Sequence, residues 1–363
     1  EFWSALQQLG NANRPDNVAV RSVVREKANN LCDTIRSTYN QLTALQDDIN
    51  AELAVRVGRI NTLAGQIAGL NGEIAKISAV GDAPNDLMDQ REVLVAELSK
   101  MTSIAIQSDE LNRYSISISG MLLVTGDQAY SIETQVDTDP TNSIPDGLYD
   151  VVWSHNGRAV EFTNGEIKGL IEMRDEEVES YMDALDGFAD TLITAFNAQH
   201  AEGYDLDGNL GGDFFTGSDA SSIALDDAIL DDDGLRRIAA TWLEPPETWD
   251  GQVGNGENAL ELADLLKNQT FAALGDNTLS DYYDSLIAKL GVDAEKAQVT
   301  HMNQQTLVGH LRNMQESVAG VSLDEEMANL IRFQNSYNAA ARLMTAIDET
   351  LDKLINGTGI VGR

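Results

Sequence analysis

The C-terminal forty residues or so carry the pattern that most restricts the fold. From Leu330 onward an apolar residue recurs at alternating steps of three and four: Leu330, Phe333, Tyr337, Ala340, Met344, Ile347, Leu351 and Leu354. Steps that average about 3.5 residues predict one helix that supercoils against a partner helix. We therefore predict a helix over 323–355, about 50 Å long at ~1.5 Å per residue, whose stripe, with Leu323, forms an assembly interface. Left in water, such a stripe promotes aggregation, so it needs a partner.

Helical periodicity also covers most of the remaining chain. From Asn17 to Ser78 the pattern is almost uninterrupted, and the break at "VGDAPND" precedes a second helix that ends near Met101. The period of 3.6 returns over 166–200 and again from about Asn258, with a break around "GDNTLSD". These segments predict amphipathic helices.

Between the helices lie two stretches with a different pattern. In "RYSISISG", Tyr114, Ile116 and Ile118 alternate with serines, which predicts a half-buried strand inside a β region over 105–163. Residues 201–253 are rich in Gly and Asp and contain short apolar pieces that suggest strands or edge loops.

The order of these segments predicts a mainly α fold with inserted β regions. We expect a long helical rod built from both ends of the chain, a β-rich domain projecting from its middle, and a C-terminal coiled-coil helix. The predicted domains are a discontinuous helical rod (1–104, 165–202 and 256–321), one β-rich outer domain (105–164 and 203–255) and an assembly segment (322–363).

Two partners for the C-terminal stripe remain open from the pattern alone. One is the chain's own helix over 45–78, in an intramolecular hairpin. The other is a helix outside this sequence, either in an N-terminal segment or in a neighbouring subunit.

The charge of the chain excludes some classes of partner. With 59 acidic against 24 basic residues the net charge is -35, so nucleic acid and anionic membranes are disfavoured. No apolar run approaches the roughly 18 residues of a membrane span, and a Sec-type leader is not expected. The acidic excess, strongest over 201–250, is explained either by a solvated surface or by adaptation to salt. Cys32 is the single cysteine and is predicted to be a small buried residue of a helix.

A calcium loop is the first chemical motif to test. Asp205, Asp207 and Asn209 occupy the first, third and fifth positions of an EF-hand-like loop. The sixth position is Leu210 where a glycine is needed, and the twelfth is Thr216 where a glutamate is needed. The pattern therefore favours a Gly/Asp turn cluster, and we predict no metal site.

Other motifs do not indicate catalysis either. His301 and His310 lie nine residues apart and cannot share a metal on one helix, and His155 and His200 are interpreted as surface or capping residues. "GTGIVG" at 357–362 matches a dinucleotide pattern only by count, because no strand precedes it. We predict neither an enzyme nor a cofactor.

Four stretches resemble one known family. "VSLDEEMANLIRFQNSYNAAARLMTAIDETLDKLING" resembles the C-terminal signature of bacterial flagellar rod, hook and hook-associated proteins. "PNDLMDQREVLVAELSK", "GEIKGLIEMRDEEV" and "GYDLDGNLGGDFF" resemble the family of flagellar hook-associated protein 1, of the FlgK type. Hook protein shares only the first of the four, so a hook or rod protein is the nearest alternative, and an extracellular enzyme or metal-binding module on a helical scaffold is a more distant one.

The resemblance implies a structural subunit at the junction between hook and filament. Its expected partners are further copies of itself in a ring, hook protein, hook-associated protein 3, an export chaperone and the flagellar type III export apparatus. It also implies an extracellular location in the flagellum. In this family the C-terminal stripe pairs with an N-terminal rod helix, which we expect to precede Glu1 and to be missing here.

Overall fold

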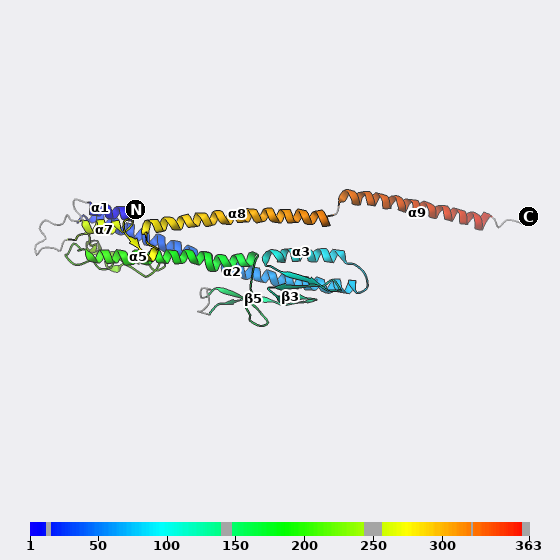
Figure 1. The fold of residues 1–363 in the computed structure, drawn as a ribbon, viewed down its shortest axis with the longest axis horizontal. Coiled ribbons are helices and arrows are strands. Elements are labelled where there is room, and N and C mark those ends of the chain that lie inside the picture. Colours follow the sequence, from blue (N-terminus) through cyan, green and yellow to red (C-terminus); the bar gives the residue numbers. More distant parts are fainter. Residues whose placement is uncertain (12–15, 139–146, 243–255, 321, 358–363) are drawn as a thin grey trace, which may run out of the picture. The chain divides into compact units, whose positions relative to one another are not determined.

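A computed structural model describes residues 1–11, 16–138, 147–242, 256–320 and 322–357. Helices predominate within them, and short strands lie between the helices (Figure 1). The predicted mainly α fold with inserted β regions is therefore confirmed. The chain divides into two compact units, Glu1–Leu286 and Ile287–Arg363. Most of the "GTGIVG" stretch and the end of the predicted second β stretch, 243–255, lie outside the described residues.

The backbone of unit 1 is α2, which spans Val18–Ser78 in 61 residues. Asn17 caps its N-terminus by accepting a hydrogen bond from the Ala19 N–H at 2.9 Å. Its apolar residues recur on one face, and six of them on that face are at most 3% exposed: Leu53, Val57, Ile60, Leu63, Ile67 and Ile74. The uninterrupted helix predicted from Asn17 to Ser78 is therefore confirmed.

Unit 1 also contains shorter helices. They are α1 (Phe2–Gly10), α3 (Asn85–Met101), α4 (Glu166–Glu172), α5 (Glu179–Glu202), α6 (Asp227–Leu230) and α7 (Glu257–Asp264). A π-helical segment, Met173–Val178, joins α4 to α5, and 3-10 turns cover Gly234–Arg237 and Ala272–Leu274. Figure 1 shows α5 running alongside α2.

The first β region forms a sheet and a hairpin. The antiparallel sheet has the order β1-β2-β3-β4, from Ala105–Ser108, Tyr114–Ile118, Met121–Thr125 and Gln128–Ala129. A hairpin pairs β5 (Ile132–Val136) with β6 (Tyr149–Trp153). Ile116 and Ile118 are buried as the alternation predicted, while Ser115 and Ser117 on the other face of the strand are only partly buried. Two further two-stranded pairs are short: β7 (Phe215–Thr216) with β8 (Ala224–Leu225), and β9 (Thr270–Phe271) with β10 (Asn277–Thr278).

The two β stretches belong to different hydrophobic cores. Strands of the first stretch pack on α3 and on α2 residues 53–68. The second stretch, through Phe214, Phe215 and Ile223, packs instead with α1, the start of α2 and α5. The prediction of one β-rich domain from 105–164 and 203–255 is corrected here, because each stretch covers a different part of the α2 face.

Three asparagines of α2, two of them buried, fix the first β region to this helix. Asn71 accepts a hydrogen bond from the Tyr114 N–H at 3.0 Å and donates one to the Tyr114 carbonyl at 2.8 Å. Asn61 does the same with Ile132, at 2.9 and 2.7 Å. Asn50 accepts from the N–H of the residue that begins β6 at 2.9 Å. Each asparagine thus binds the first residue of a strand. An amide side chain offers both a donor and an acceptor, so it satisfies strand groups that lack a neighbouring strand there.

The described part of unit 2 is almost entirely helical. It contains most of α8 (Leu279–Ala319), followed by α9 (Leu323–Gly357). The predicted break near "GDNTLSD" is present, with a left-handed Gly275 and a positive φ at Asp276. Unit 2 begins at Ile287, earlier than the predicted assembly segment at residue 322.

Candidate assembly interface

The predicted assembly residues all lie on α9. Ser322 precedes the helix and accepts a hydrogen bond from the Glu325 N–H, an arrangement typical of an N-terminal capping box. Asp324, Glu325 and Glu326 place negative charge in the first turn, where the helix dipole stabilises it. The helix then continues without a break to Gly357, so the stripe forms one continuous surface.

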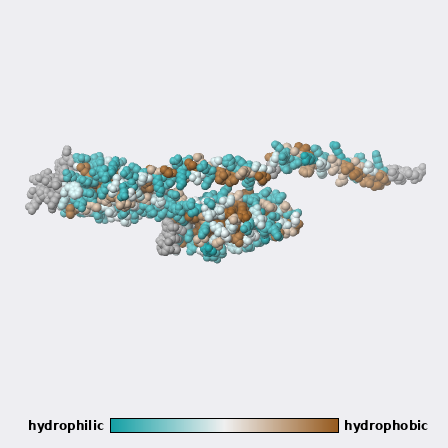
Figure 2. All heavy atoms as spheres, in the orientation of Figure 1, coloured by the Kyte–Doolittle hydropathy of each residue, from teal (hydrophilic) through white to brown (hydrophobic). Residues whose placement is uncertain are grey.

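Every large residue of the α9 stripe is exposed. We use this name for Leu323, Leu330, Phe333, Tyr337, Ala340, Met344, Ile347, Leu351 and Leu354. The exposed fraction of the large side chains runs from 48% at Ile347 to 79% at Leu323. Figure 2 shows hydrophobic side chains gathered along α9. Full burial of a large apolar side chain contributes about 1.5–3 kcal/mol, so covering the stripe would stabilise an assembly by roughly 10 kcal/mol before the entropy lost on association.

Apolar residues beside the stripe widen this surface. Met327, Ile331, Leu343 and Ile355 flank the predicted positions, and all are more than half exposed. They were not predicted, because alternating steps of three and four select the residues of a single line along the helix. The signal that could have found them is the run of apolar residues around Leu343, which covers a broader arc than a two-helix seam uses.

Exposed apolar side chains also lie on α8, outside the predicted stripe. Its apolar side chains from Ile287 onward include Leu290, Leu307, Leu311 and Val318, each at least half exposed. This segment was predicted to belong to the rod because its helical period continues from about Asn258. The period alone does not show whether the apolar side chains are buried. Both helices of unit 2 therefore present apolar side chains.

The intramolecular alternative is disfavoured by the packing of unit 1. The hairpin would pair the α9 stripe with the apolar face of α2 between residues 45 and 78. That face is already covered, since Ile60, Leu63 and Ile67 lie in the core formed with α3 and the first β region. The second alternative, a helix outside this sequence, stays a prediction.

The calcium-like loop has a structural role. The Asp205 carboxylate accepts hydrogen bonds from the backbone N–H groups of Asp207 and Asn209, both at 2.8 Å, and so shapes a tight turn. Asp207 points elsewhere and pairs with Arg236, which lowers the pKa of the aspartate and raises that of the arginine. Among the described residues no cluster of three or more His, Cys, Asp or Glu side chains is arranged to hold a metal ion.

His200 differs from its prediction as a surface or capping residue. The ring is fully buried, its Nδ1 lies 2.7 Å from the Gly212 carbonyl, and its Nε2 accepts a hydrogen bond from the Ala239 N–H at 2.9 Å. Because Nε2 accepts a hydrogen bond, it carries no proton and the ring is neutral; desolvation lowers the pKa of the imidazole in the same sense. Cys32 is buried as predicted, and burial raises the pKa of its thiol to about 12.

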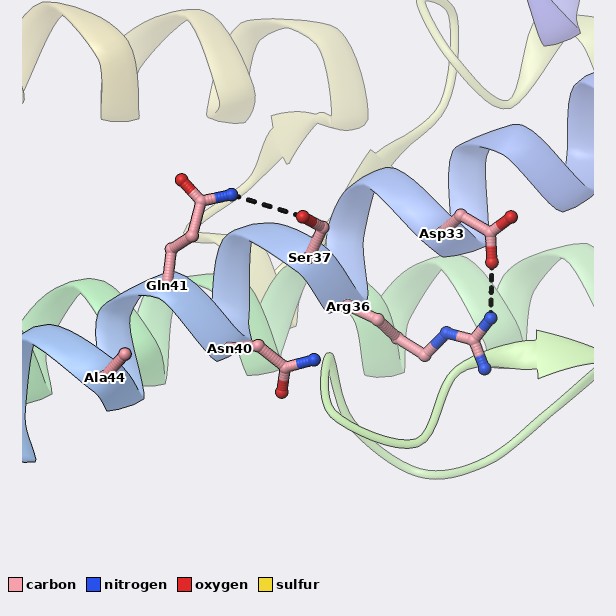
Figure 3. Close-up of a pocket in the computed structure, with 6 residues that line it drawn as sticks. All are labelled: Asp33, Arg36, Ser37, Asn40, Gln41 and Ala44. Atoms are coloured by element: carbon pink, nitrogen blue, oxygen red, sulfur yellow. Dashed lines mark hydrogen bonds and ion pairs between the residues drawn. The ribbon is translucent and has the colours of Figure 1, made fainter.

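An open groove on α2 does not resemble an active site. It has a volume of about 520 Å³ and is lined by Asp33, Arg36, Ser37, Asn40, Gln41 and Ala44 (Figure 3). Arg36 pairs with Asp33, and Gln41 donates to the Ser37 hydroxyl at 3.2 Å. These polar groups satisfy one another on an exposed helix face, and none is a nucleophile beside a base.

Comparisons with known proteins agree with the geometry. The model of the "Flagellar hook-associated protein FlgK helical domain" matches residues 1–215, and that of the "Flagellar basal body rod FlgEFG protein C-terminal" matches 315–357, which includes the whole α9 stripe. Flagellar hook-associated protein 1 of Bacillus subtilis is 31% identical over all of this chain and 76% of its own length. The Salmonella typhimurium protein of that name is 26% identical over 98% of this chain and 79% of its own.

A solved structure has the same fold. The flagellar hook junction protein FlgK from Burkholderia pseudomallei superposes with a TM-score of 0.73 over 88% of this chain and 93% of its own, at 17% identity. No described helix combines the length and the hydropathy that a membrane span requires. Since the helical-domain model matches more than half of the chain, and the Bacillus subtilis relative is 31% identical over all of it, this chain belongs to the flagellar hook-associated protein FlgK family, a family of structural proteins of the bacterial flagellum.

Proposed function

We propose that this protein joins the flagellar hook to the filament, and that it assembles into a ring through the α9 stripe. One observation carries the proposal beyond family membership. The stripe is a regular apolar surface on a continuous helix, and its large side chains are about half exposed or more. A non-catalytic subunit that assembles through helices needs such a surface and needs no reactive site.

The partner of the stripe in this proposal is a helix from outside the described chain. The resemblance to flagellar axial proteins suggests an N-terminal rod helix, with neighbouring subunits completing the contact. The argument from packing is that the apolar face of α2 is already covered within unit 1. In this proposal residues 322–363 form the assembly segment, and unit 1 supplies the helical rod and the β regions.

Further partners follow from the junction role. Hook protein and hook-associated protein 3 would contact the ring on its two sides, outside the cell. The flagellar type III apparatus would export the chain unfolded, with an export chaperone covering its C-terminal part. An exposed apolar helix supports a chaperone, because the stripe would otherwise associate before assembly. A single cysteine also means that no intramolecular disulfide has to be formed after export.

The junction proposal is tested by complementing a strain that lacks its hook-associated protein 1. A Phe333→Ser/Tyr337→Ser variant removes two aromatic side chains from the stripe, and Asn338→Ser, on a neighbouring polar position of α9, is the matched control. Electron micrographs should show hooks without filaments, and flagellin in the medium, for the stripe variant only. Full-length filaments with the stripe variant, at equal protein level, would contradict the proposal.

The export route is tested separately. The wild-type protein should be found in the medium of a filament-less strain and should remain inside cells whose flagellar export apparatus is inactive. Its appearance in the medium of the export-deficient strain would contradict type III export.

A further inference from the structure

The charge of this protein is divided unevenly between its two units. Residues 1–286 contain 50 Asp and Glu against 17 Lys and Arg, whereas residues 287–363 contain 9 against 7. Unit 1 therefore has a net charge of -33 and unit 2 of only -2. Nearly all of the acidic excess therefore lies on the unit that does not carry the stripe.

Ion pairing within unit 1 leaves most of this charge uncompensated. Its 17 cations neutralise at most 17 of its 50 carboxylates. Two of its arginines, Arg21 and Arg91, are buried in the interior. Arg21 donates to the Leu235 and Ile238 carbonyls there, and Arg91 donates to the side-chain oxygen of Asn71. Many acidic side chains are exposed to solvent, so unit 1 has a negative surface.

The two units thus contribute opposite forces when copies of the chain meet. The apolar side chains of α8 and α9 favour association, and the near-neutral charge of unit 2 opposes it little. The negative surfaces of two neighbouring copies of unit 1 repel each other. Screening shortens the range of that repulsion from ~10 Å at 0.1 M salt to ~3 Å at 1 M, while burial of apolar side chains does not depend on screening.

We propose that ionic strength regulates self-association of this protein, because screening of the acidic unit 1 permits contacts that the apolar helices of unit 2 already favour. The effect is that of a diffuse negative field and not of a cation-binding site. This inference rests on the proposed assembly through the α9 stripe, and adds that ionic strength regulates that assembly. The association constant should rise about tenfold or more between 0.1 and 1 M NaCl.

A charge-neutralised variant separates screening from the general effect of salt on apolar contacts. Six exposed acidic residues of unit 1 are changed to their amides: Asp47, Asp89, Glu110, Glu176, Glu177 and Asp232. The matched control exchanges Asp for Glu, and Glu for Asp, at the same six positions, which keeps the charge. Sedimentation equilibrium of the full chain is measured at 0.1 and 1 M NaCl, and again with tetramethylammonium chloride. Circular dichroism confirms that both variants are folded.

The expected result is that the amide variant associates more strongly than wild type at 0.1 M and depends less on salt, while the control follows wild type. Both salts should act alike, since screening depends on ionic strength alone. Association that is equally strong at all salt concentrations, or that needs one particular cation, would overturn this inference and leave the α9 interface intact. Absence of association at any salt concentration would overturn the inference together with self-association through the stripe.

Discussion

Replacing Asn71 by Leu tests whether buried asparagines hold the first β region on α2. Asn71 is fully buried, and its Nδ2 donates to the carbonyls of Tyr114 and Gly126, both at 2.8 Å. Its Oδ1 accepts from the Tyr114 N–H and from Nη1 of Arg91, both at 3.0 Å. Leucine has a similar volume and a better helix propensity, so the substitution removes the hydrogen bonds without opening a large cavity.

The expected loss of stability follows from the four hydrogen bonds. Each contributes about 1 kcal/mol net, and a buried group left without a partner costs about 1–3 kcal/mol. Better helix propensity returns roughly 0.5 kcal/mol. We therefore expect Asn71→Leu to lower the free energy of unfolding of the first β region by about 3–6 kcal/mol.

Urea unfolding followed by circular dichroism, together with hydrogen exchange of the Tyr114 amide, measures this loss. The matched control is Asn40→Leu, which changes an exposed asparagine on the same helix and should alter stability by less than about 0.5 kcal/mol. Equal stability of the two variants, or an unchanged exchange rate at Tyr114, would refute the role assigned to Asn71.

Three further predictions concern single residues of unit 1. Cys32, with a buried thiol whose pKa is about 12, should react with a thiol reagent at pH 8 only after unfolding; fast reaction of the native protein would contradict this. The folded-state pKa of His200 is lowered, so its stabilising contribution is present above the unfolded pKa of about 6.5 and is lost as pH falls through the folded pKa. The stability difference between wild type and His200→Gln should accordingly shrink from pH 8 to pH 5, and a constant difference would argue against a neutral ring. Gly211→Ala should destabilise by about 2–4 kcal/mol, since a Cβ there would lie 2.1 Å from the His200 carbonyl oxygen, whereas Gly212→Ala meets no atom within 4 Å and should melt like wild type.

Local patterns predicted the secondary structure well where the period was long. The break-free run from Asn17 to Ser78 and the alternation around Ile116 each describe one face of one element. That information is contained in neighbouring residues, because burial of a helix or strand face imposes its period directly on the sequence. The predicted positions of the α9 stripe lie on one helix for the same reason, while their role in assembly stays a prediction.

Contacts between distant residues were not predictable in this way. His200 was interpreted as a surface or capping residue, yet Gly212 and Ala239 bind both ring nitrogens in the interior. The asparagines of α2 looked like ordinary polar positions, because their partners lie 43 to 99 residues away in the chain. No local pattern identifies a backbone group that another segment will bring next to a side chain.

The amino-acid sequence by itself determined which faces of the helices and strands are apolar, that nearly all of the net negative charge lies outside the last 77 residues, and that the C-terminal helix presents a regular stripe. Only the tertiary structure decided what covers those faces: α3 and the first β region cover the middle of α2, and the second β stretch packs with α1 and α5 in a separate core. The physical reason is that the hydrophobic effect is non-directional, so a periodic apolar face requires cover without specifying its partner. Shape, buried hydrogen bonds and chain connectivity select that partner.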